Sequence, residues 1–184
     1  MGHPFSSQAG GQTDINNVAA GTFRCAPVRH ILSVKVSQGA HMKLAWSDSI
    51  DNLDWSELAA LYRAAPLGNK LPATLQVAFT NSMFRCFVRE NGVLVGVGRA
   101  LADGTDCSYI CDVAVMPSHQ GTGLGKAIVA KLLALSAGHK KIILYAVPGK
   151  EPFYKKFGFR RMRTAMAIFE NQALAAERGY IDES

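Results

Sequence analysis

Three glycines at alternate positions mark a stretch of the sequence that is suited to binding an anion. Gly121, Gly123 and Gly125 follow an apolar, strand-like run that stops at Pro117, and from Lys126 onward apolar residues recur at helical spacing. The start of a helix leaves several backbone N–H groups without partners and carries partial positive charge. Glycines place no side chain in front of those amides, so the stretch predicts a pyrophosphate-binding turn at a helix start.

The two best-known phosphate-binding patterns are absent from this stretch. The Walker pattern needs a glycine where the sequence has Gln120, and a serine or threonine where it has Ala127. The dinucleotide fingerprint needs a third glycine that neither Gly-x-Gly pair supplies. The spacing that is present is Gln-x-x-Gly-x-Gly, which resembles the acetyl-CoA signature of the GNAT superfamily of N-acetyltransferases.

A second motif strengthens this resemblance. The run from Glu151 to Phe159 resembles the superfamily's other signature, a short helix that carries Phe-Tyr, then a basic residue, then Gly-Phe. Its tyrosine, Tyr154, lies 34 residues beyond Gln120. The resemblance covers roughly residues 43–170. More narrowly, the Asp112–Val115 strand and the Phe-Tyr motif are similar to small bacterial and plastid members, which include acetylators of arylalkylamines such as serotonin.

The elements that must position these motifs can be read from periodicity and turn residues. Asp54 and Glu57 resemble a capping box that opens a helix, Pro72 suits the first position of a second helix, and Gly92 lies in a hairpin turn. We expect strands at 43–46, 84–88, 93–101, 109–116 and 141–147, helices at 54–62, 72–81, 123–137 and 152–156, and closing strands between Phe159 and Phe169. This order is that of the GNAT fold, an α/β (α+β) fold whose mixed, mostly antiparallel sheet contains a central β-α-β crossover that binds acetyl-CoA.

The resemblance also implies the cofactor contacts. The co-substrate is acetyl-CoA, held by the main chain of the strand and by the amides of the turn. These residues are Val113, Ala114, Val115, Gln120, Gly121, Thr122, Gly123, Leu124, Gly125 and Lys126. Many relatives carry an asparagine where this sequence has Val147, so no side-chain cofactor contact is expected there.

Catalytic roles follow from the same resemblance. Tyr154 holds the position of the general acid that protonates the departing thiolate. Two residues stay open as the base, Tyr109 and Asp112, each acting through a water relay. Asp112 faces away from Tyr109 unless a bulge intervenes.

Three other positions have expected roles that are not acid or base. Cys111 has no His or carboxylate placed by sequence to activate it as a nucleophile. His119 is expected to be an exposed turn residue, and residues 67–71 are expected to form a wall of the acceptor cleft.

These observations predict an N-acetyltransferase that transfers an acetyl group directly from acetyl-CoA to a primary amine of a small molecule, an arylalkylamine or similar, in a ternary complex. The alternatives are an aminoglycoside or protein-lysine acetyltransferase and a noncatalytic acyl-CoA-binding sensor. Family members are often dimers, so a homodimer stays open.

Composition limits the other classes of function. The hydrophobic content is 48%, the charged content is 18% and the net charge is +6, which is typical of a globular enzyme with an anionic ligand. We expect no metal, no nucleic acid, no membrane partner and a cytoplasmic location, because no metal spacing, basic aromatic stripe, apolar span or signal peptide occurs. Residues 1–41 are expected to be a disordered or cloning-derived leader before a single domain, residues 42–184.

Overall fold

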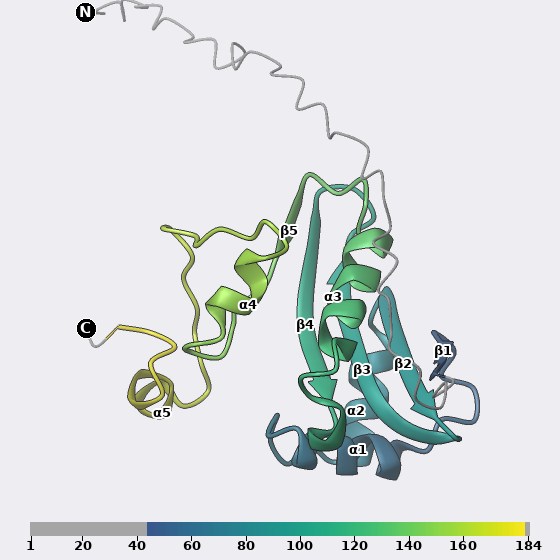
Figure 1. The fold of residues 1–184 in the computed structure, drawn as a ribbon. Coiled ribbons are helices and arrows are strands. Elements are labelled where there is room, and N and C mark those ends of the chain that lie inside the picture. The colour runs from purple at the N-terminus through teal and green to yellow at the C-terminus, as the bar shows by residue number, and fades with distance from the viewer. Residues whose placement is uncertain (1–43, 183–184) are drawn as a thin grey trace, which may run out of the picture. The chain divides into compact units, whose positions relative to one another are not determined.

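A five-stranded sheet organises the part of the chain that the structure describes, residues 44–182 of a computed structural model (Figure 1). Its strands lie in chain order: β1 (Leu44–Ser47), β2 (Phe84–Glu90), β3 (Val93–Ala102), β4 (Cys107–Val115) and β5 (Lys141–Ile143). The first four are antiparallel and β5 is parallel to β4. The predicted mixed, mostly antiparallel sheet is therefore confirmed. The predicted leader, residues 1–41, lies outside the described residues.

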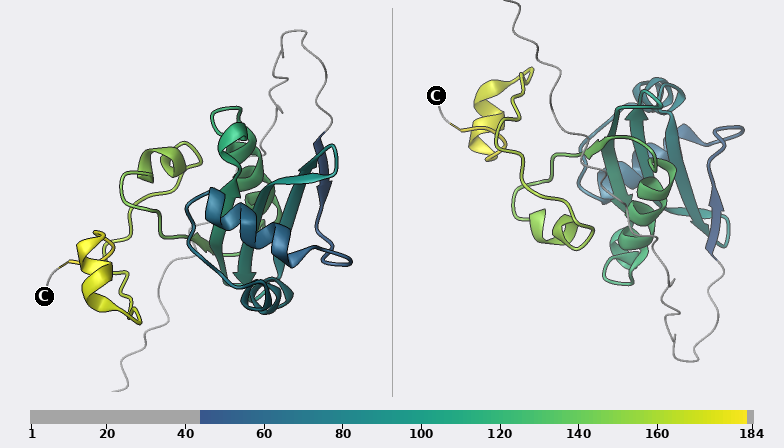
Figure 2. Two further views of the ribbon diagram at one scale, coloured as in Figure 1. Left: turned by 90° about the horizontal axis from the view of Figure 1, so that it is seen from below. Right: turned by 90° about the horizontal axis from the view of Figure 1, so that it is seen from above.

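The alternation of side chains along the strands creates two apolar faces. On one face Phe87 and Val97 pack with α1 (Trp55–Ala64) and α2 (Pro72–Thr80). On the other face Cys86 and Val88 pack with α3 (Leu124–Leu135). Figure 2 shows helices on both faces of the sheet. Because successive residues of a strand point to opposite sides, one strand serves both layers of the core.

The first helix begins where the sequence predicts. Asp54 accepts hydrogen bonds from the amides of Ser56 and Glu57, at 2.8 and 3.2 Å, which satisfies two otherwise unpaired donors. The reciprocal half of the predicted capping box is not formed. The Glu57 carboxylate instead accepts from the amide of Leu94 at 2.7 Å and from Arg89 at 2.8 Å, so it ties α1 to the sheet.

Two glycines of β3 allow α3 to approach the sheet closely. A Cβ atom added to Gly98 would lie 2.5 Å from Cγ2 of Ile128 and 2.9 Å from Cδ1 of Leu132. One added to Gly96 would lie 2.9 Å from Cδ1 of Ile128. No real side chain tolerates such distances, so the depth at which α3 sits depends on these two positions lacking a side chain.

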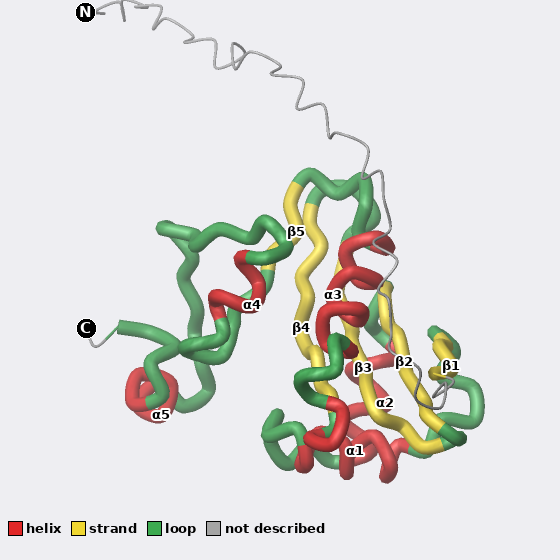
Figure 3. The backbone as a smooth tube through the Cα atoms, viewed as in Figure 1, coloured by secondary structure: helices red, strands yellow, loops and turns green. Residues whose placement is uncertain are grey.

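The C-terminal part of the prediction was wrong in detail. The strand expected over 141–147 ends at Ile143, and the stretch from Phe159 to Phe169 contains no strand (Figure 3). Pro148 and Gly149, the latter at φ 83°, form a turn that follows after the strand has already ended. A strand needs an edge to pair with, and β5 offers only three residues. Met166 and Ile168 stay 97% and 94% exposed, so no apolar burial draws this stretch onto the sheet.

The remaining elements are short. A 3₁₀ turn, η1 (Pro117–His119), precedes the glycine-rich loop, and α4 (Glu151–Lys155) and α5 (Gln172–Glu177) follow β5. None of the helices within residues 44–182 is long and apolar enough to cross a membrane.

Gly98→Ala should lower the free energy of unfolding by about 1–3 kcal/mol, because its methyl group overlaps Ile128. Urea denaturation of Gly98→Ala, Ile128→Ala and the double variant provides the measurement. Removal of the Ile128 side chain makes room for the new methyl group, so the double variant should lose less stability than the two single losses added together. Additive losses would show that the close approach is not the constraint described above.

Candidate active site

The start of α3 is open to an anion. Gly123 occupies the N-cap position in a left-handed conformation, φ 95°, and no side chain caps the helix. This differs from α1, where Asp54 fills the same position. Gly121 is also left-handed, φ 78°, and no atom lies within 4 Å of where a Cβ of Gly121 or Gly123 would be. The amides of the first turn therefore lack both a helical acceptor and a covering side chain, which fits a diphosphate.

Side chains around this loop hold its shape instead of reaching outward. Gln120 donates from Nε2 to the carbonyl of Val115 at 3.1 Å, and the Thr122 hydroxyl donates to the carbonyl of His119 at 2.7 Å. His119 was expected to be exposed, but its side chain is only 14% exposed. Its ring lies 3.0 Å from the Glu90 carboxylate and 2.8 Å from the Ser118 hydroxyl, which anchors the turn to β2. Lys126 is exposed on the first turn of the helix, whereas the side chain of Leu124 is buried in the core.

Strand β4 offers unpaired main-chain groups beside this loop. Its pairing with β5 covers only Cys107 to Tyr109, so the stretch from Ile110 onward has no neighbouring strand on that side. On the other side, Met116 donates to Val95 at 2.9 Å, and hydrogen-bonded pairs alternate along an antiparallel ladder. The alternation makes Ala114 bond to β3 and turns the main-chain groups of Val113 and Val115 toward the open side. An extended amide-containing chain can pair there, while the carbonyl of Val115 is already engaged by Gln120.

The short helix α4 lies close to the start of α3. A Cβ added to Gly125 would be 3.8 Å from Cζ of Phe153 and 3.7 Å from a methyl carbon of Val115, so α4, β4 and the loop meet at this point. Tyr154 follows Phe153, and the two rings pack edge to face with centroids 5.0 Å apart. Burial raises the pKa of Tyr154, so its phenol stays protonated at neutral pH.

A bulge in β4 changes which residues share a face. Arg99 is opposite Asp112 and Ala100 is opposite Ile110, so Cys111 is an extra residue in the ladder. Asp112 thereby comes near Tyr109. The pKa of Tyr109 is raised first by burial and further by Tyr145, Cys111 and Asp112. Burial also raises the pKa of the Cys111 thiol, which keeps it in the form that is a poor nucleophile.

Asp112 is held between two cations. Nε of Arg99 lies 2.5 Å from one carboxylate oxygen, and Nζ of Lys70 lies 3.2 Å from the other. Both oxygens of this candidate base are therefore occupied in the structure. Sequence reasoning missed both partners, although a single arginine in the apolar run of β3 and a lysine in the expected acceptor wall were available signals.

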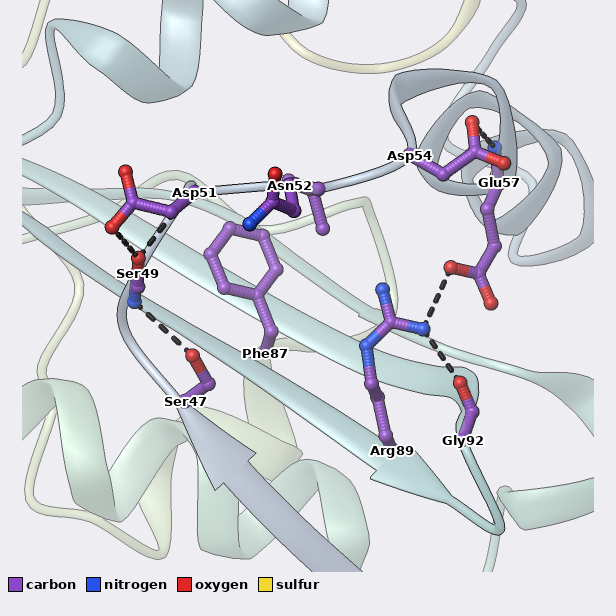
Figure 4. Close-up of a pocket in the computed structure, with 10 residues that line it drawn as sticks. Ser47, Ser49, Asp51, Asn52, Asp54, Glu57, Phe87, Arg89 and Gly92 are labelled. Carbon is purple, nitrogen blue, oxygen red and sulfur yellow. Dashed lines mark hydrogen bonds and ion pairs between the residues drawn. The ribbon is translucent and has the colours of Figure 1, made fainter.

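The hollow that the structure forms near the start of α1 contains none of the predicted site residues (Figure 4). It has a volume of about 330 Å³, with Phe87 at its floor. Its polar groups are largely engaged with one another: Arg89 donates to Glu57 and to the carbonyl of Gly92, and the Ser49 hydroxyl donates to Asp51. The predicted residues lie instead on β4, on the loop and first turn of α3, and, for Tyr154, on α4.

Residues 48–159, more than half of the chain, match the family described as Acetyltransferase (GNAT) family. The chain belongs to this family. The prediction of GNAT membership is thus confirmed, and the glycine-rich loop and the open edge of β4 both lie within the matched residues.

Several known proteins are similar to this acetyltransferase-family chain. Serotonin N-acetyltransferase 2, chloroplastic, from Oryza sativa subsp. japonica is 42% identical over 67 residues, which are 35% of this chain and 34% of the relative. Glucosamine 6-phosphate N-acetyltransferase from Trypanosoma brucei brucei is 40% identical over 67 residues, 35% of this chain and 46% of the relative. The chain thus spans between a third and a half of the length of these curated relatives.

A probable acetyltransferase, SA2161, from meticillin-resistant Staphylococcus aureus has the same fold. It superposes with a TM-score of 0.62 at 21% identity, over 70% of this chain and 99% of the other. This likeness supports the arrangement of the sheet and helices.

Thr122→Glu should weaken CoA binding by about 5- to 30-fold, or about 1–2 kcal/mol, because it places a negative charge beside the exposed amides of α3. Thr122→Gln is the matched control, since it also loses the bond to His119 but adds no charge. Isothermal calorimetry with CoA at low and high salt measures both. Equal losses in the two variants would contradict an anion site at this helix start.

Proposed function

We propose that the protein is an acetyl-CoA-dependent N-acetyltransferase that acts in a ternary complex, with a primary amine of a small molecule, an arylalkylamine or similar, as acceptor. The observation that carries this proposal is the uncapped start of α3 beside the unpaired stretch of β4. Those two features suit the two parts of CoA, a diphosphate and an extended arm that contains amides. The family membership supports the same reaction.

The co-substrate supplies an activated acetyl thioester, and the chain supplies position and protons. The amides from Gly121 to Lys126 would hold the diphosphate, and the main-chain groups of Val113 and Val115 would align the arm. Holding the acceptor against the thioester lowers the entropic part of the barrier. An amine attacks only in its neutral form, so a proton must leave the acceptor and another must reach the departing sulfur.

Tyr154 is the proposed proton donor to that sulfur. A thiol has a reference pKa of about 8.5 and a tyrosine of about 10, and burial of Tyr154 widens this gap, so the phenol is a weak acid toward the thiolate and donates its proton as the C–S bond breaks. The raised pKa keeps Tyr154 in the donating form over the whole neutral range. The helix that carries it adjoins the start of α3 through Phe153 and Gly125.

Asp112 is the better of the two proposed proton acceptors. The raised pKa of Tyr109 keeps that phenol protonated at neutral pH, so it can relay a proton but is not an acceptor by itself. Asp112 offers a carboxylate instead, and one of its oxygens is covered only by the side chain of Lys70. We therefore assign the proton from the acceptor to Asp112.

An aromatic cluster next to the bulge supports an aromatic acceptor. The rings of Tyr109 and Tyr145 stack with centroids 6.3 Å apart, and Tyr145 is 60% exposed. Phe169 and Tyr180 pack against Tyr145 from the C-terminal segment, at 6.2 and 5.8 Å. Such rings stack favourably on an aryl group. The neighbouring Lys70, Arg99 and Asp112 carry a net charge of +1, which disfavours polycationic acceptors such as polyamines and aminoglycosides.

Replacement of Tyr154 by phenylalanine should lower kcat by about 100-fold or more while the KM for acetyl-CoA changes little, because the variant loses the proton donor but keeps the ring. Steady-state thiol release measures both constants, and calorimetry with CoA checks that the site is intact. If Tyr154→Phe has the same kcat as the unchanged protein at every pH from 6 to 10, Tyr154 has no role as proton donor.

Thiol release from acetyl-CoA across a panel of amines tests the function itself. The panel contains tryptamine, phenethylamine, spermidine, an aminoglycoside, glucosamine 6-phosphate and a lysine peptide. We expect the highest kcat/KM with the two arylalkylamines. CoA binding without thiol release in the presence of any of these amines would favour a noncatalytic sensor, and a preference for another amine would correct the acceptor class.

A further inference from the structure

The side chain of Lys70 lies in surroundings that suit a free ammonium ion. Its Nζ is 3.2 Å from Oδ1 of Asp112 and 5.0 Å from the centroid of the Tyr62 ring. A carboxylate oxygen and an aromatic face together are the groups that recognise an alkylammonium in proteins. Lys70 comes from the loop between α1 and α2, whereas both groups that it contacts belong to regular elements of the fold.

The two cations on Asp112 are held very differently. Arg99 is 13% exposed; besides binding Oδ2 of Asp112, it contacts the Ser82 hydroxyl at 3.3 Å and lies 5.7 Å from the Phe79 ring centroid. It is therefore a fixed part of the core wall. Lys70 is 35% exposed, and the Asp112 carboxylate is its one hydrogen-bond partner among the described residues. Because a lysine side chain has a long flexible stem, the Lys70 ammonium can move away from Asp112 while Arg99 keeps its contacts.

Movement of the Lys70 side chain away from Asp112 would expose Oδ1 of Asp112 beside the unpaired stretch of β4. Asp112 belongs to the stretch of β4 that has no strand on its β5 side, immediately after the bulge at Cys111. In the structure Arg99 engages only Oδ2 of the carboxylate, through its Nε, while its Nη1 is directed to the Ser82 hydroxyl. A primary ammonium that takes the place of Lys70 keeps one ammonium charge beside Oδ1 of Asp112.

We propose that Oδ1 of Asp112 and the face of Tyr62 form the binding site for the ammonium of the acceptor, and that Lys70 occupies this site in the free protein as a displaceable substitute. This inference rests on the proposed acetyltransferase function and names the class of group that the site accepts, a primary alkylammonium. Lys70 then acts as a built-in competitor that raises the amine concentration needed for turnover.

A purely structural role for Lys70 predicts the opposite behaviour. An ion pair that only ties the loop to the sheet would, when removed, loosen the acceptor wall and weaken amine binding. Removal of a competitor would instead strengthen amine binding. The sign of the change therefore separates the two roles.

Lys70→Met tests this, because it removes the ammonium and keeps an unbranched apolar chain. In the absence of acetyl-CoA, n-butylammonium chloride is titrated into the full chain and followed by NMR. We expect binding to Lys70→Met that is about two- to fivefold tighter than to the unchanged protein, the scale of losing a partly exposed ion-pair competitor. Lys70→Arg retains a cation and should bind no more tightly than the unchanged protein. Butyramide, which is neutral, should not bind to the unchanged protein, to Lys70→Met or to Lys70→Arg.

Asp112→Asn in the Lys70→Met background should abolish the gain, and its thermal unfolding is measured in parallel because Arg99 loses its counter-ion. Should that variant fail to fold, the comparison of Lys70→Met with Lys70→Arg still decides the question. Equal or weaker n-butylammonium binding by Lys70→Met would overturn the proposal.

Turnover provides the second readout and separates the two levels of inference. With the best amine of the panel, Lys70→Met should show a lower KM for the amine and an unchanged KM for acetyl-CoA. Thiol release that is present but insensitive to Lys70→Met would overturn the ammonium site alone. Tighter ammonium binding without any thiol release would leave the site in place and overturn the proposed acetyl transfer.

Discussion

Strand β4 is paired along its whole length on one side and for only three residues on the other, and the candidate site depends on this asymmetry. On the β3 side the ladder fixes the strand in the core, with Ala114 buried. On the β5 side the partner ends at Ile143. Since unpaired main-chain groups are strong hydrogen-bonding groups, the open stretch is a ready partner for an extended ligand. A full-length β5 would have closed it.

The position of α3 places the uncapped helix start next to this open stretch of β4. Gly96 and Gly98 let the helix lie unusually close to β3, which brings its uncapped start near the end of β4. The helix start and the open stretch of β4 are then parts of one continuous surface. The same closeness explains why Gly125 has Val115 and Phe153 as its nearest neighbours, so that the helix carrying Tyr154 adjoins the loop. Packing in the core and geometry at the site thus have a common origin.

The charge of Asp112 at the bulge is balanced by residues that lie far from it in the sequence. Asp112 is bound by Arg99, 13 residues away, and by Lys70, 42 residues away. A buried carboxylate needs such partners, because an uncompensated charge in this position would be costly. One partner is embedded in the core wall and the other is on a loop, and this difference gives the site a part that can exchange.

The sequence by itself determined the features that are local. The glycine spacing at 121–125, the Asp54 cap, the Gly92 hairpin turn and the apolar alternation of the strands each follow from the conformational preferences of a few adjacent residues. They were enough to predict the first four strands and the main helices, and the resemblance of two motifs predicted the family. What only the tertiary structure decided are the features that need two distant segments. These are the early end of β5, the missing closing strands, the bulge that turns Asp112 toward Tyr109, the anchoring of His119 on Glu90, and the two cations on Asp112. Register and charge pairing depend on which segments meet, and no local preference of the chain encodes that.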